Sequence, residues 1–89
     1  MVSSFRDLIA YQKAYKMSLD IHKLTLSFPK FEQHELASQL RRASRSVTLN
    51  IAEGFGRKHR STLADFRRFI VTALGSCDEV RVGLTFAKT

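Results

Sequence analysis

Residues 63–89 read LADFRRFIVTALGSCDEVRVGLTFAKT, and this stretch decides the fold. Its apolar residues recur without a slip at alternating spacings of three and four. They are Leu63, Phe66, Ile70, Ala73, Cys77, Val80, Leu84 and Ala87. Such a repeat is typical of a helix packed in a left-handed bundle. Because Thr62 and Asp65 resemble a capping box, we predict that this helix opens at Ser61-Thr62.

A first helix with the same period is predicted for residues 5–27, with Ser3 or Ser4 as its N-cap. Its stripe consists of Ala10, Ala14, Met17, Ile21, Leu24 and Phe28, widened by Leu8, Tyr15 and Leu19. Pro29 ends this helix, because the residue before a proline is pushed out of the helical region.

A second helix is predicted for residues 33–55. Its stripe consists of Leu36, Leu40, Ala43, Val47, Ile51 and Gly54. Gly54 and Gly56 bracket the end of this helix as C-terminal punctuation. Asn50 and Glu53 are interpreted as a buried polar pair that fixes the helix register, with Gly54 permitting a close helix approach.

The predicted fold is therefore all-α, with a single domain over residues 1–89. Long amphipathic helices joined by short loops pack as an antiparallel up-down bundle, with Pro29 and Gly56 in the two connections. The third stripe is still in register at the end of the sequence, and it needs cover along its full length. We therefore expect a fourth helix that is missing from this chain or supplied by another subunit.

The net charge of +7 is concentrated in one window, residues 41–68, which contributes +6. Its basic residues are Arg41, Arg42, Arg45, Arg57, Lys58, Arg60, Arg67 and Arg68. Such a surplus attracts polyanions, and the arginine fork suits phosphate, so we predict that these residues contact RNA or DNA. Arg41 and Arg45 lie opposite the apolar stripe of the second helix and should face solvent or a partner. A solvated basic face is the simpler alternative.

Several other classes of function are not supported by the sequence. No pair of titratable groups indicates catalysis, so we expect neither enzymatic activity nor a cofactor. No two histidines stand three or four residues apart, which excludes a helical pair of metal ligands. Cys77 is interpreted as a small buried residue, and the absence of a second cysteine fits a reducing cytosol. Without a signal peptide or an apolar span, we expect a cytoplasmic protein.

A second apolar set lies on the face of the third helix opposite its stripe, joined by one residue on the outer side of the second helix. The predicted oligomer interface consists of Leu49, Val71, Gly75, Val82 and Phe86. An aligned apolar set that contains a glycine favours a contact between subunits, so we expect a homo-oligomer.

Six stretches resemble the small four-helix-bundle proteins encoded within 23S rRNA intervening sequences. They are FRDLIAYQKAY (5–15), FPKFEQHEL (28–36), QLRRAS (39–44), NIAEGFGRK (50–58), ALGSCDEVR (73–81) and LTFAK (84–88). The resemblance implies a cytoplasmic bacterial bundle that forms a ring-like oligomer, such as a pentamer, and that continues into a fourth helix. The fold more distantly resembles the accessory variability protein of diversity-generating retroelements, a basic pentamer that partners a reverse transcriptase and its nucleic acid.

Two functions follow from these observations. The first is a small, basic, oligomeric binding module that contacts RNA or DNA through an arginine-rich surface without catalysis. The alternative is a protein–protein adaptor or accessory subunit, for example of a reverse transcriptase, whose basic face binds an acidic partner. Counterion release from nucleic acid gives a steep dependence on salt, which separates the two in part.

Overall fold

A computed structural model describes residues 4–57 and 62–87 of the chain. Three long helices dominate it: α1 (Ile9–Leu26), α2 (Ser38–Arg57) and α3 (Leu63–Ala87). A 3-10 helix, η1 (Phe5–Asp7), precedes α1. A second 3-10 helix, η2 (Lys30–Glu32), and a π-helix, η3 (Gln33–Ala37), lie between α1 and α2. The described ranges contain no β-strand, so the all-α prediction is confirmed.

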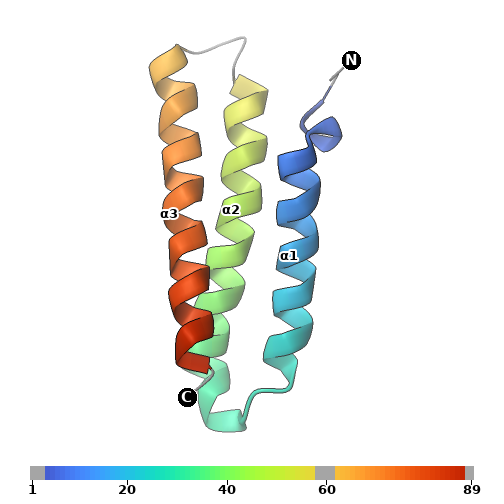
Figure 1. The fold of residues 1–89 in the computed structure, drawn as a ribbon, viewed down its shortest axis with the longest axis vertical. Coiled ribbons are helices and arrows are strands. Elements are labelled where there is room, and N and C mark those ends of the chain that lie inside the picture. The colour runs from blue at the N-terminus through green and yellow to red at the C-terminus, as the bar shows by residue number, and fades with distance from the viewer. Residues whose placement is uncertain (1–3, 58–61, 88–89) are drawn as a thin grey trace.

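The three helices stand side by side, with α2 between α1 and α3 and antiparallel to both (Figure 1). The molecule is elongated, with extents of 44 × 23 × 17 Å. Both neighbours pack against α2, whereas α1 and α3 have little contact with each other. The central position of α2 explains why its stripe is the most completely buried of the three.

Ser4 forms an N-terminal cap as the sequence predicts, but it caps η1 rather than α1. The Ser4 hydroxyl accepts a hydrogen bond from the Arg6 amide at 3.2 Å, and the Ser4 amide donates to Asp7 Oδ2 at 3.2 Å. These bonds close η1, and the backbone then turns extended at Leu8 before α1 begins at Ile9. The predicted start of the first helix is therefore four residues too early.

The core is centred on one residue from α1, two from α2 and one from α3. These are Ile21, Leu40, Ala43 and Val80. All four belong to the predicted stripes, and the half-buried Met17, Phe28, Leu36 and Leu84 pack around them. The core therefore lies toward the end of the bundle that holds the α1–α2 connection.

Glycine brings α2 and α3 close together at two levels. A β-carbon at Gly54 would lie 3.0 Å from Cβ of Phe69, and one at Gly83 would lie 2.6 Å from Cδ2 of Leu40. Close approach at Gly54 is as the sequence predicts. The predictions that Gly54 and Gly56 punctuate the helix end and that Gly56 lies in the second connection are wrong, because α2 continues through both glycines to Arg57.

Two hollows with mainly apolar linings lie between α1 and α3, and they are together called the groove. One hollow is lined by residues that include Ala10, Ile51 and Phe66, and the lining of the other includes Leu24 and Leu84. Cys77 also lines the groove and is exposed, so the prediction that it is buried is wrong. The reason is that this part of the α3 stripe faces the gap beside α1 rather than α2. The expected cover by a further helix or subunit remains a prediction.

Candidate nucleic-acid interface

The arginines of the basic window divide into two groups in the structure. One group lies on α2 and consists of Arg41, Arg42 and Arg45, and the other lies on α3 and consists of Arg67 and Arg68. The side chain of Arg57 and the whole of Lys58 and Arg60 lie outside what the structure describes. The α2 group and the α3 group have different surroundings.

Arg41 is not a free surface arginine, which corrects the expectation that it faces solvent. Its side chain is half-buried, Nε donates to Thr25 Oγ1 at 2.8 Å, and Nη2 donates to Gln33 Oε1 at 2.9 Å. The Gln33 amide in turn donates to the Thr25 carbonyl at 2.7 Å and to the Phe28 carbonyl at 3.0 Å. Arg41 therefore fastens α2 to the end of α1 and to the connection between them.

The predicted exposure of Arg42 and Arg45 is confirmed. Both are exposed on α2, and neither has a hydrogen bond or ion pair with another described residue. Beside Arg45, at the seam between α1 and α2, lies a hollow of about 160 Å³. Its lining residues are Ser18, Leu19, His22, Arg41 and Arg45. This hollow combines two guanidinium groups, an imidazole and a hydroxyl, and none of these described lining residues is acidic.

Sequence reasoning missed the α1 side of this hollow. Ser18 and His22 stand four residues apart and therefore lie on one helix face. The signal that could have identified them is that spacing on the side of α1 away from its stripe. This spacing identifies the hollow only when the side of α1 that lies beside Arg41 and Arg45 is known.

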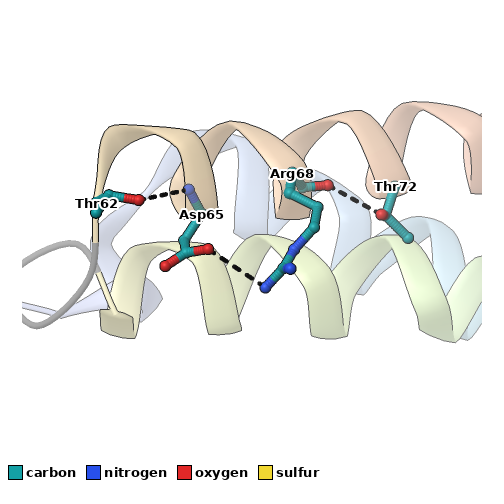
Figure 2. Close-up of polar contacts among 4 residues, drawn as sticks. All are labelled: Thr62, Asp65, Arg68 and Thr72. Atoms are coloured by element: carbon teal, nitrogen blue, oxygen red, sulfur yellow. Dashed lines mark hydrogen bonds and ion pairs between the residues drawn. The ribbon is translucent and has the colours of Figure 1, made fainter.

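The α3 group sits near the start of its helix, where Figure 2 shows the polar contacts. The Asp65 amide donates to Thr62 Oγ1 at 3.2 Å, which is one half of the predicted capping box. Arg68 Nη2 lies 3.5 Å from Asp65 Oδ1, and the Thr72 hydroxyl donates to the Arg68 carbonyl at 2.9 Å. Arg68 is thus partly neutralised, whereas Arg67 is exposed without an ion pair to any described residue.

The structure does not merge the two groups into one cluster. Gly54 packs against Phe69, the neighbour of Arg68, and it follows Arg45 by nine residues. At 1.5 Å per residue the groups are about 14 Å apart along the bundle. Arg45 also faces the α1 seam, while Arg67 and Arg68 project from α3. A ligand that contacts both must extend along the bundle.

The residues predicted to form an oligomer interface are all exposed. Leu49, Val71, Val82 and Phe86 have exposed fractions of 52–66%, and a β-carbon at Gly75 would meet nothing within 4 Å. Val82 and Phe86 lie together in a hollow between α2 and α3. Leu49 lies on α2 and is not among the residues that line this hollow.

Asn50 takes part in a polar link between helices, but its partner is Ser46 rather than the predicted Glu53. Its amide donates to the Ser46 carbonyl at 2.8 Å and to Ser46 Oγ at 3.0 Å. The hydroxyl of the buried Ser76 on α3 donates to the same Ser46 Oγ at 2.8 Å. The link fixes the register of α2 against α3. Glu53 is exposed, so the prediction that it forms a buried polar pair with Asn50 is wrong.

The described residues offer neither a metal site nor a membrane span. No group of three histidine, cysteine, aspartate or glutamate side chains in these ranges is placed to hold a metal ion. None of the described helices has the length and apolar character required to cross a membrane.

Comparison with known proteins gives one result. The model of the family described as 23S rRNA-intervening sequence protein matches residues 6–89. No match emerges among curated proteins or solved structures. The match covers α1, α2 and α3 in full, including both arginine groups.

Proposed function

The chain belongs to the 23S rRNA-intervening sequence protein family, and we propose that it is a cytoplasmic binding module that contacts RNA or DNA without catalysis. The phosphate contacts come from exposed arginines on α2 and α3. The module works as a homo-oligomer, and the proposal extends to a ring such as a pentamer.

The unpaired state of Arg42, Arg45 and Arg67 carries this proposal. Each is exposed and has no ion pair with a described residue, although the neighbouring Arg68 and the more distant Arg81 have carboxylate partners. An exposed guanidinium without a partner keeps its full charge and its forked donors for an incoming phosphate. Within residues 4–57 and 62–87, no carboxylate forms an ion pair with any of these three arginines.

Replacing Arg42 and Arg45 together by alanine is expected to weaken binding to unrelated nucleic acid sequences about equally. It should also flatten the dependence of log K on log salt by roughly 0.7–0.9 for each lost phosphate contact. Fluorescence anisotropy with labelled RNA and DNA over a salt series measures both quantities. Circular dichroism should show unchanged helicity, because both side chains are exposed.

The matched control removes two cations elsewhere, with Lys16→Ala and Arg81→Ala in one variant. Arg81 already pairs with Asp78 at 2.8 Å, and both Lys16 and Arg81 are exposed. This control should retain the wild-type salt slope. An equal loss of affinity in both variants would indicate only a response to net charge. Wild-type protein without salt-sensitive affinity for RNA or DNA would favour the adaptor that binds an acidic protein partner.

The oligomer is tested separately with Val82→Glu. This substitution places a charge in an exposed apolar hollow beside Phe86, and it should shift the protein to a smaller species in light scattering with helicity intact. Leu26→Glu, at another exposed apolar position, on α1, is the control and should leave the size unchanged. A wild-type protein that is already monomeric at micromolar concentration would contradict this interface.

A further inference from the structure

A row of aromatic rings follows the N-terminal part of the chain. The rings of Phe5 and Tyr11 meet edge to face with centroids 5.0 Å apart. The rings of Tyr11 and Tyr15 are stacked, with centroids 6.1 Å apart and planes inclined by 29°. Tyr15 is 50% exposed, so one end of the row is open to solvent rather than part of the core.

The row leads directly into the basic hollow at the α1–α2 seam. From Tyr15, steps of three and four residues reach Ser18, Leu19 and His22, which places all of them along one side of α1. Tyr15 precedes His22 by seven residues, which is about 10 Å along the helix. Rings and hollow therefore form one continuous strip rather than two separate features.

Positive charge is present at both ends of this strip. At the N-terminal end the Arg6 guanidinium lies over the Phe5 ring at 4.7 Å from its centroid. At the other end are Arg45, which has no partner among the described residues, and Arg41. The bonds from Arg41 to Thr25 and Gln33 fix its guanidinium in place, so little side-chain freedom remains to be lost on binding.

From this arrangement we infer that the strip binds single-stranded nucleic acid. A base stacks on the open face of Tyr15, and the adjoining phosphates lie in the hollow beside Arg45, Arg41 and His22. Aromatic platforms beside a basic track are the recognition mode of unpaired strands, since the bases of a duplex are stacked on one another and cannot reach a ring. The inference rests on the proposed function and specifies its ligand.

The test compares a labelled single strand with the duplex of the same sequence, as RNA and as DNA, at one salt concentration. Wild-type protein should bind the single strands more tightly. Tyr15→Ala should weaken single-strand binding by about 5-fold to 150-fold, the effect of losing one stacked base, and should leave duplex binding unchanged. Tyr15→Phe, which keeps the ring, should bind as wild type.

The control is Phe31→Ala, which removes a ring that is 77% exposed in η2 and does not line the basic hollow. It should not change affinity for either form. Duplex binding as tight as single-strand binding, or full single-strand affinity in Tyr15→Ala, would overturn this inference. The binding proposal would then still stand if the Arg42 and Arg45 variant lost affinity. Absence of binding to both forms would overturn the two together.

Discussion

Replacing Leu40 with alanine is expected to destabilise the bundle by about 2–5 kcal/mol, as large-to-small changes in a core do. Leu40 is 1% exposed and belongs to the cluster formed with Ile21, Ala43 and Val80. Its side chain also fills the space above Gly83 on α3. The substitution therefore opens a cavity between all three helices, and urea unfolding followed by circular dichroism measures its cost.

Two further variants test whether the stability cost of a substitution falls as the side chain becomes more exposed. Leu84→Ala should cost less than Leu40→Ala, because Leu84 is half-buried and lines the groove beside α1. Thr72→Ala removes an exposed hydroxyl bonded only to the Arg68 carbonyl and should be nearly neutral. If Leu84→Ala costs as much as Leu40→Ala, the groove must be covered in solution. The order of the three costs thus reports on the expected further helix or subunit.

The helix period predicts the three long helices because it is a local property, whereas the punctuation signals are right at Pro29 and Thr62 and wrong at Gly54 and Gly56. Pro29 lies between α1 and η2 as expected, and the Thr62 cap precedes α3. The apolar period identifies the apolar face of each helix, but it does not identify which other helix packs against that face. The period predicts that the α3 stripe needs cover along its full length, whereas the structure buries Ala73 and Val80 and leaves Cys77 exposed beside the groove.

The candidate site could be predicted only in part. Charge counting identifies Arg42 and Arg45, since an exposed position opposite an apolar stripe follows from the period. It cannot identify Tyr15 and His22, because their role depends on how α1 is rotated against α2. Tyr15 was assigned to the margin of the apolar stripe, yet half of it is exposed. Arg41 was misplaced for the same reason, since its partner Thr25 belongs to another helix.

Arg41→Ala is expected to lower stability by about 1–3 kcal/mol, in contrast to the exposed arginines beside it. The change removes two hydrogen bonds from a charged group, each worth about 1.5–3 kcal/mol when fully buried and less at a half-buried site. Gln33 loses the partner of its carbonyl oxygen in the same step. The ends of α1 and α2 then depend on the remaining bonds of the Gln33 amide.

The control for this variant is Arg45→Ala, which removes the same charge from an exposed position four residues away and should change stability by less than about 0.5 kcal/mol. Arg41→Lys keeps the charge but not the fork, so it should lose most of what alanine loses. Chemical unfolding of the three variants measures the differences. Equal stability of Arg41→Ala and Arg45→Ala would contradict the fastening role. Arg41→Ala is expected to lower stability, so its affinity for nucleic acid must be compared with that of wild type at temperatures where the variant is fully folded. Otherwise a loss of folded protein would be counted as a lost phosphate contact.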